Sequence, residues 1–525
     1  MKDTTMNGAE CLLRTLLANG VDTCFMNPGT SEMQFVAALD RVPEMRAVLC
    51  LFEGVCAGAA DGYARMTGRP AATLLHLGPG LANGLANFHN ARKARSPVLS
   101  IVGQHSTQHL LHDAPLTADI EALARPVSGY VRTVERAGDI GKEASAAVEA
   151  ARTAPGQVAT LIVPADFSWS DAGEPGSALP HLPAPCPQAG RIQQAAAVLR
   201  SGEPAGLLLG GSALLPEGFE PAAQLAAATG VRVLGNRNGA RYGCGGGRVT
   251  PPRLPYFPEA AEAALAGLKH LILVECRPPI SFFGYPGRRS ELAPPDCAMH
   301  VLASAEEDGA AALRALAREW GVASAPLALQ APKPDWPQSE ALTPDAIGRV
   351  LAHLLPEGAI ISDETVSSGE AILRHLAPAA AHDLLPVAGG SIGQGLPVAV
   401  GAAVACPDRK VIALEADGSA MYTLQSLWTM ARERLDVTTV ILANRRYRIL
   451  EIEMRRTGGG AVGPRAGEMI DLTRPEPDWV KLAGGFGVPA VRVTTAGEFI
   501  REFGAAVGQP GPRLIEAVLD VSGPS

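Results

Sequence analysis

Asp417 and Asn444 bear side-chain oxygens, and each follows an apolar stretch of the chain. The stretch VIALEA leads into Asp417, Gly418 and Ser419, a helix is expected from about Tyr422 to Glu433, and a second apolar stretch ends at Asn444. Asp417 and Asn444 are 27 residues apart (444 − 417), but a strand-helix-strand path returns the chain to the same edge of a parallel sheet. A carboxylate, an amide oxygen and a backbone carbonyl suit Mg²⁺ or Ca²⁺, and N–H groups at the helix start could bind a diphosphate. The alternative is that Asp-Gly-Ser forms an ordinary turn and helix cap.

Glu53 is a second candidate for chemistry. It follows the apolar run Ala47 to Phe52 and precedes a stretch of small residues, Gly54 to Tyr63, that is expected to be helical. A carboxyl group there should be largely buried, and burial favours its protonated form, which suits a shared proton with a ring nitrogen. The alternative is a glutamate placed favourably at a helix N-terminus.

A glycine-rich stretch, VAGGSIGQGLPVAVGAAVA, runs from Val387 to Ala405. Its glycines allow a tight turn and a close approach of the backbone to a ligand, and a helix of small residues is expected to follow. On its own this pattern is also typical of a generic nucleotide-binding loop.

Together, and in this order, the three motifs resemble those of thiamine diphosphate enzymes. The resemblance implies that Glu53 bonds the pyrimidine ring of the cofactor and that Ile392 wedges between its two rings. It implies a metal site made of the Asp417 and Asn444 side chains and the Arg446 carbonyl. The other cofactor contacts that it implies are Asn83, Val366, Ser367, Gly390, Gly418, Ser419 and Tyr447. Two residues depart from the usual motif, because Ala416 replaces a glycine and Ala443 replaces an asparagine.

The stretch LHLGPGLANGLANFHNA, Leu75 to Ala91, resembles benzoylformate decarboxylases and includes His76, while its GPG-x-x-N pattern also resembles acetolactate synthases. By this resemblance His76 is a catalytic acid or base, since imidazole titrates near neutral pH, and Thr30 stands where benzoylformate decarboxylases have an active-site serine. The alternative for His76 is that it caps the end of a strand or bonds a carbonyl. His89 is expected to pack on its own helix.

Two features of these relatives have no match in the chain. The second histidine of benzoylformate decarboxylases is absent from residues 277–287, which offer Phe282 and Phe283 instead, and no lysine follows the strand that ends at Val163. The middle of the chain shows no flavin motif, so FAD is not supported.

The implied activity is decarboxylation of a 2-keto acid, carboligation to a 2-hydroxyketone or acetolactate-type product, or both. Phe282, Phe283 and Tyr285 favour an apolar or aromatic substrate side chain. The substrates would be 2-keto acids or aldehydes, and the resemblance implies a homodimer or homotetramer with active sites at the subunit interface. A nicotinamide-dependent dehydrogenase is disfavoured because no strand opens into G-x-G-x-x-G with an acidic residue about 20 positions on. A degenerate paralogue with a binding or regulatory role is disfavoured because Glu53, Asp417 and Asn444 are retained.

The elements that must position these residues are those of three α/β domains with doubly wound parallel sheets. Proline-rich stretches at residues 174–188 and 325–344 predict linkers, and the domains are expected at residues 1–180, 181–335 and 336–525. The resemblance makes the first a pyrimidine-binding domain, the second a central Rossmann-like domain and the third the diphosphate- and metal-binding domain. The expected strands are Val21–Met26, Ala71–Leu75, Val98–Val102, Val158–Val163, Ala205–Leu209, Leu271–Val274, Ala359–Ser362, Lys410–Leu414 and Thr438–Leu442.

Composition bounds the remaining possibilities. The 525 residues are 47% hydrophobic and 19% charged with a formal net charge of -8, which argues against nucleic acid or an anionic membrane as the main partner. Nine cysteines are scattered without metal-ligand spacing, and no apolar run approaches the length that spans a bilayer. We therefore expect a cytoplasmic protein with reduced thiols.

Overall fold

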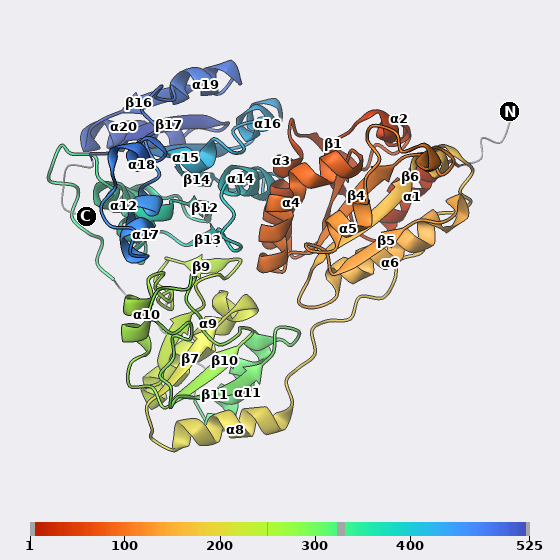
Figure 1. Ribbon diagram of the computed structural model, residues 1–525. Helices are drawn as coiled ribbons and strands as arrows, with labels where there is room; N and C mark the ends of the chain where they lie inside the picture. The colour runs from red at the N-terminus through yellow and green to blue at the C-terminus, as the bar shows by residue number, and fades with distance from the viewer. Residues whose placement is uncertain (1–5, 249, 323–330, 521–525) are drawn as a thin grey trace.

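The computed structural model describes residues 6–248, 250–322 and 331–520, arranged as three α/β domains around three sheets (Figure 1). The start of the second expected linker, residues 325–330, lies outside the described residues. The expected fold class is confirmed, since each expected strand coincides with an observed strand to within two residues at either end. Within the described ranges, no helix combines the length and the apolar character needed to cross a membrane.

The first domain is built on a sheet of six parallel strands in the order β2-β1-β3-β4-β6-β5. Its strands are β1 (Thr23–Asn27), β2 (Arg46–Leu49), β3 (Ala71–Leu75), β4 (Val98–Gln104), β5 (Tyr130–Thr133) and β6 (Val158–Pro164). Its helices are α1 (Gly8–Ala18), α2 (Met33–Leu39), α3 (Glu53–Thr67), α4 (Leu77–Ala94), α5 (Ile120–Ala124), α6 (Ile140–Arg152) and α7 (Ala165–Trp169), with 3₁₀ turns η1 (Thr30–Glu32), η2 (His109–His112) and η3 (Ala137–Asp139).

The middle domain has a four-stranded parallel sheet in the order β11-β10-β7-β8. Its strands are β7 (Ala205–Leu209), β8 (Arg232–Gly235), β10 (His270–Val274) and β11 (Ala298–Ala303), and its helices are α8 (Ala189–Arg200), α9 (Pro216–Thr229), α10 (Pro258–Leu265) and α11 (Gly309–Trp320), with η4 (Gly211–Leu214). A short strand between β8 and β10 in sequence, β9 (Tyr242–Cys244), pairs antiparallel with β13 (His382–Pro386) of the third domain. The middle segment thus supplies an edge strand to the neighbouring sheet.

The third domain has seven strands in the order β16-β17-β15-β14-β12-β13-β9, and all of them except β9 run parallel. Its own strands are β12 (Ala359–Glu364), β13, β14 (Val411–Ala416), β15 (Val437–Ala443), β16 (Ala490–Val493) and β17 (Arg513–Val518). Its helices are α12 (Pro344–Leu354), α13 (Gly369–Leu373), α14 (Gly395–Ala405), α15 (Asp417–Ala420), α16 (Ser426–Arg432), α17 (Arg448–Arg456), α18 (Pro464–Glu468), α19 (Trp479–Gly485) and α20 (Ala496–Val507), with η5 (Val366–Ser368).

The helix expected from Tyr422 to Glu433 is wrong in its bounds. Helix α15 begins at Asp417 itself, and α16 follows after a turn. The Tyr422 N–H donates to the Ser419 carbonyl and the Ser426 N–H to the Thr423 carbonyl, and each bond closes a tight four-residue turn. Asp417 therefore lies inside the first helical turn rather than before it.

The first and third domains meet where α3 crosses α14 (Figure 1). Both helices consist mainly of small residues, and nearly all of α3 and all but the last residue of α14 are buried. A Cβ added at Gly401 would lie 1.9 Å from the Ala59 carbonyl oxygen, and one at Gly62 would lie 2.2 Å from the Val398 carbonyl oxygen. Glycine is therefore required for this close crossing, which fixes the helix bearing Glu53 against the helix that follows the glycine-rich loop.

Candidate active site

The expected metal residues meet at the carboxyl edge of the third sheet. Strands β14 and β15 are neighbours, and Ala416 is paired with Leu442, so Asp417 and Asn444 both lie just past the ends of adjacent strands. Asp417 is 5% exposed; its Oδ1 accepts from the Gly418 N–H at 2.9 Å and its Oδ2 from the Arg445 N–H at 2.6 Å. Burial raises the pKa of Asp417 to about 6, against the lowering effect of these two N–H groups. A cation at this edge would stabilise the ionised form.

The turn after β15 arranges the other expected metal ligands. The Arg446 N–H donates to Asn444 Oδ1 at 3.0 Å, and Arg445 has a φ of +62°, which folds the chain sharply here. The Arg446 carbonyl accepts from the Arg448 N–H at 2.9 Å. Tyr447 precedes α17 as its N-cap residue, and its ring covers Gly418, where an added Cβ would lie 2.4 Å from the ring. The described residues hold no cluster of three or more His, Cys, Asp and Glu side chains suited to a metal, so a site here depends on this mixed oxygen set.

The residues expected to meet a diphosphate follow β12. Val366 has a φ of +47° and is 41% exposed. A β-branched residue rarely adopts this left-handed conformation, and such strain concentrates at functional sites. Ser367 is the next residue of η5, so the structure puts both expected contacts in one strained turn beside the sheet edge.

Two buried glutamates beneath the glycine-rich loop were not anticipated from the sequence. Glu364 on β12 is paired with Glu415 on β14, and both side chains are buried. Glu364 accepts from the Gly393 N–H at 2.7 Å and the Gly395 N–H at 2.6 Å, and burial raises its pKa to about 7. Glu415 lies against Glu364, and burial together with that neighbour raises the pKa of Glu415 well above its usual range. The pair therefore carries at most one negative charge near neutral pH.

Glu53 is the first residue of α3 and is 7% exposed, as expected. Its Oε2 accepts from Asn83 Nδ2 at 3.0 Å, so another expected cofactor residue orients the carboxyl group. A Cβ added at Gly80 would lie 3.3 Å from Glu53 Oε1 and 3.5 Å from the Cβ of His76. Gly80 therefore lies beside both the Glu53 carboxyl group and the Cβ of His76, so the structure brings Glu53 and His76 close together.

His76 lies between β3 and α4 and is oriented by a carboxylate. Its Nδ1 is 2.8 Å from Oε2 of the buried Glu32, which also accepts from the Gly29 N–H at 2.9 Å. Burial raises the pKa of Glu32, against the lowering effect of His76. The His76 side chain makes no capping bond at the start of α4. Thr30 is exposed at the start of η1, next to Gly29, whose Cα packs against the His76 ring.

A glutamate that holds Nδ1 leaves Nε2 of His76 available to a ligand. Glu32 belongs to the same NPGTSE stretch as Thr30, but only the fold shows that it meets His76, which is 44 residues away.

The glycine-rich loop is reached from the middle domain by an aromatic side chain. A Cβ added at Gly390, where φ is +78°, would lie 2.5 Å from the Phe282 ring. The ring centroids of Phe282 and Phe283 are 5.0 Å apart, and both side chains are partly exposed. Tyr285 donates to Glu453 on α17 at 3.1 Å. Ile392, two residues after Gly390, is half-buried.

These features define a class of protein. Residues 6–123 match the thiamine pyrophosphate enzyme N-terminal TPP binding domain, and residues 370–517 match the C-terminal TPP binding domain of the same enzymes. The chain belongs to the thiamine pyrophosphate enzyme family.

Individual relatives lie in the two expected branches. IlvX of Mycobacterium tuberculosis, whose name places it with acetolactate synthase large subunits, is 52% identical over 516 residues, covering 98% of this chain and 99% of IlvX. Benzoylformate decarboxylase of Pseudomonas aeruginosa is 29% identical over 527 residues, covering 95% of this chain and 96% of that enzyme. The thiamine diphosphate-dependent 4-hydroxybenzoylformate decarboxylase of Rhodococcus jostii RHA1 shares the fold, with a TM-score of 0.84 at 24% identity over 98% of this chain and 100% of that one.

Proposed function

We propose that the chain is a thiamine diphosphate- and Mg²⁺-dependent enzyme that acts on a 2-keto acid, by decarboxylation, carboligation or both. The observation that carries the proposal is the state of the Glu53 carboxyl group. Its Oε2 is held by Asn83, while no group among the described residues bonds Oε1, which lies beside Gly80. Glu53 is only 7% exposed, and a carboxyl oxygen left free on a largely buried side chain fits a ring nitrogen that shares a proton with it.

The residues at the carboxyl edge of the third sheet fit the diphosphate of the cofactor and its metal ion. Asp417, Asn444 and the Arg446 carbonyl would hold Mg²⁺ as hard oxygen ligands, and the ion would also bind diphosphate oxygens. Val366, Ser367, Gly418 and Ser419 border the same sheet edge. Bound thiamine diphosphate supplies a nucleophilic carbon and an electron sink.

The chain's own residues orient the reactants and move protons. Glu53 would exchange a proton with the pyrimidine ring, with Asn83 fixing its direction. His76, held through Nδ1 by Glu32, would bind or protonate the substrate through Nε2. Thr30 lies on the same edge of the sheet, and Phe282 and Phe283 would line the side that receives an apolar or aromatic substituent.

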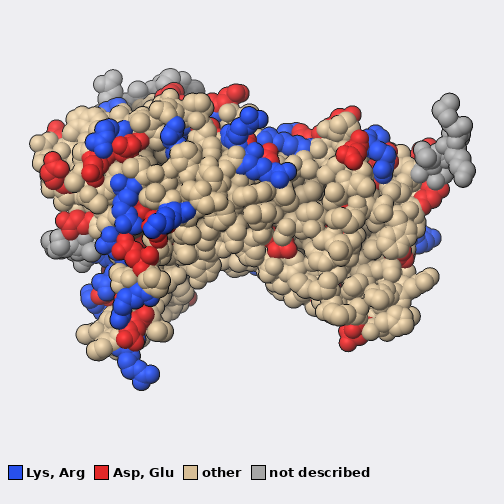
Figure 2. All heavy atoms as spheres, turned by 90° about the horizontal axis from the view of Figure 1, so that it is seen from above, with Lys and Arg blue, Asp and Glu red and all other residues tan. Residues whose placement is uncertain are grey.

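The active unit is proposed to be a homodimer, with a homotetramer as its assembly. Large apolar side chains border the expected cofactor residues and are exposed in the single chain: Val366 (41%), Met421 (38%), Tyr422 (54%) and Leu450 (50%). Figure 2 shows, between the two ends of the molecule, a broad area with few charged side chains. Exposed large apolar side chains that lie together typically mark an interface, and a second copy would cover these four.

Glu53→Gln tests the proposal. Purified wild type, Glu53→Gln and the exposed control Glu44→Gln would be incubated with thiamine diphosphate, Mg²⁺ and either pyruvate or benzoylformate. CO₂ would be measured and the products identified by chiral chromatography, which separates aldehyde release from carboligation. The expected result is turnover by wild type and Glu44→Gln, and cofactor binding with at least 100-fold lower turnover for Glu53→Gln, about the contribution of a positioned acid or base. Unchanged turnover in Glu53→Gln contradicts the role of this residue, and no CO₂ from either substrate contradicts the 2-keto acid assignment.

A further inference from the structure

The backbone before Ile392 is held by a side chain from the first domain. Asn90 on α4 donates from Nδ2 to the Ser391 carbonyl at 2.8 Å and accepts the Ser391 N–H on Oδ1 at 3.1 Å. One amide side chain, 0% exposed, therefore pairs both polar backbone groups of Ser391.

The backbone after Ile392 is held from two directions. The Gly393 N–H donates to Glu364, and the Gly393 carbonyl accepts from Asn87 Nδ2 at 3.1 Å and from Thr423 Oγ1 at 3.0 Å. The backbone groups of Ser391 and Gly393, which flank Ile392, are therefore hydrogen-bonded, although Ile392 makes none of these bonds itself.

Asn87 also connects this loop to the helix that carries Glu53. The same Nδ2 atom that donates to the Gly393 carbonyl donates to the Gly54 carbonyl at 2.8 Å. Asn90 Nδ2 lies 3.1 Å from Asn87 Oδ1 and orients it. The buried amide of Asn87 therefore bonds two segments that are more than 300 residues apart in sequence, the start of α3 and the glycine-rich loop.

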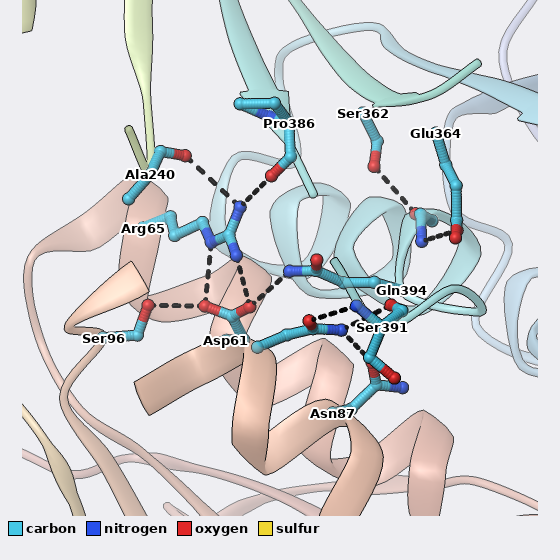
Figure 3. A network of polar contacts seen from close by, with 12 residues as sticks. Asp61, Arg65, Asn87, Ser96, Ala240, Ser362, Glu364, Pro386, Ser391 and Gln394 are labelled. Carbon is cyan, nitrogen blue, oxygen red and sulfur yellow. Dashed lines mark hydrogen bonds and ion pairs between the residues drawn. The ribbon is translucent and has the colours of Figure 1, made fainter. Parts of the chain in front are cut away.

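Gln394 makes a second connection between the loop and α3 (Figure 3). Its Nε2 donates to Asp61 Oδ2 at 2.7 Å, and Asp61 is in turn paired with Arg65 on the same helix. Figure 3 shows Asn87, Ser391 and Gln394 side by side between the helices of the first domain and the loop of the third. The loop cannot shift without leaving several buried polar groups unpaired.

We propose that Asn87 and Asn90, here called the asparagine clamp, are positioning residues that fix the backbone on both sides of Ile392 and make this loop and the Glu53 helix one rigid unit. The role of Ile392 and Glu53 toward the cofactor rests on the proposed function. Because displacement of a reacting group by about 1 Å can lower a rate about 100-fold, the clamp acts on turnover more than on substrate binding.

Hydrogen exchange of the cofactor-free protein tests the clamp without any activity. The variants are Asn87→Ala and Asn90→Ala, with Arg92→Ala as the control, because Arg92 is exposed on the same helix. We expect faster exchange at residues 389–395 in both alanine variants, and faster exchange at the start of α3, residues 53–58, in Asn87→Ala, with no change in Arg92→Ala. Unchanged exchange at either segment in Asn87→Ala overturns the link. If an alanine variant does not fold, Asn87→Asp or Asn90→Asp serves instead, because aspartate keeps the acceptor oxygen of each side chain and loses its donor amide.

Steady-state kinetics at saturating cofactor then separates positioning from a loss of folded protein. The clamp predicts full cofactor stoichiometry, a nearly unchanged KM and a kcat lower by about 10- to 100-fold in each variant. The kcat of the double variant should be only slightly lower than that of the less active single variant, because both residues act on one unit. A kcat equal to that of Arg92→Ala overturns the proposal, as does a kcat that falls only in proportion to bound cofactor. If wild type turns over no 2-keto acid, the proposed function fails, and hydrogen exchange alone decides the clamp.

Discussion

Replacing Arg65 with methionine removes the cation from a buried ion pair that joins all three domains. Arg65 donates to Asp61 through two bonds, from Nε to Oδ1 at 2.8 Å and from Nη2 to Oδ2 at 2.7 Å, and the side chains are 1% and 0% exposed. Its Nη1 also donates to the Pro386 carbonyl at 2.8 Å and the Ala240 carbonyl at 3.3 Å. The methionine keeps the apolar stem but leaves the Asp61 carboxylate buried, with Ser96 and Gln394 as its remaining side-chain donors.

The size of the effect follows from burial. Removing one partner of a buried ion pair costs about 3–5 kcal/mol, because the other charge stays desolvated. The pair of Arg69 with Asp22 is the matched control: its atoms are 3.5 Å apart, and its side chains are 53% and 46% exposed. Arg69→Met should therefore cost at most about 1 kcal/mol.

Urea unfolding followed by near-ultraviolet circular dichroism measures both variants. Three domains need not unfold in one step, so the comparison is made on the transition in which the domains separate. A double-mutant cycle with Asp61→Leu should give a coupling energy of about 2–3 kcal/mol for Arg65 and Asp61. A loss in Arg65→Met no larger than in Arg69→Met, or a coupling energy near zero, would refute the reasoning.

The close packing at Gly401 and the burial of Asp417 each have a measurable consequence. Gly401→Ala should separate α3 from α14, because its Cβ would lie 1.9 Å from the Ala59 carbonyl oxygen, and should lower the free energy of unfolding by about 1–3 kcal/mol in the same urea assay. Gly497→Ala is the control, since this helical position has nothing within 4 Å of an added Cβ and the free energy of unfolding should not change. Equal effects of the two substitutions would contradict the close crossing of the helices. With a pKa of about 6, Asp417 contributes stability to the metal-free protein that is complete below the pKa of an unfolded Asp, about 3.9, and is lost as pH rises through 6. Because Mg²⁺ must displace that proton, the affinity for Mg²⁺ with thiamine diphosphate should fall about tenfold from pH 7 to pH 5 in a fluorescence titration, and equal affinities would show that Asp417 does not bind the ion.

Much of the fold could be predicted because short local patterns in the sequence indicate its strands and helices. Parallel strands buried on both faces appear as short apolar runs, and residues that follow them, such as Asp417 and His76, necessarily lie at one edge of a sheet. The same logic located Glu53 at the start of its helix. The bounds of α15 and α16 were missed because tight turns between Ser419 and Ser426 interrupt an otherwise continuous helical pattern.

The rest of the site depends on contacts between domains, which no local pattern encodes. Asn87 is one of several asparagines on α4, and only the packing of α4 on the third domain gives it the Gly393 carbonyl as a partner. His89 was expected to pack on its own helix, but its Nε2 lies 3.1 Å from the Gly389 carbonyl. In the sequence, Glu364 and Glu415 are ordinary residues near the ends of two strands. Only the pairing of β12 with β14 places them side by side. In the same way, β9 leaves the middle domain's sheet for an edge of the third one.

A crystal structure of the wild-type protein with thiamine diphosphate and Mg²⁺ would show whether Glu53 and the residues around Asp417 bind the same cofactor. We expect one cofactor molecule with its pyrimidine ring at hydrogen-bond distance from a Glu53 carboxyl group and its diphosphate joined through Mg²⁺ to Asp417 and Asn444. A cofactor bound at only one of these ends, or electron density showing that Glu53 and Asp417 face unrelated cavities in the assembled protein, would contradict it.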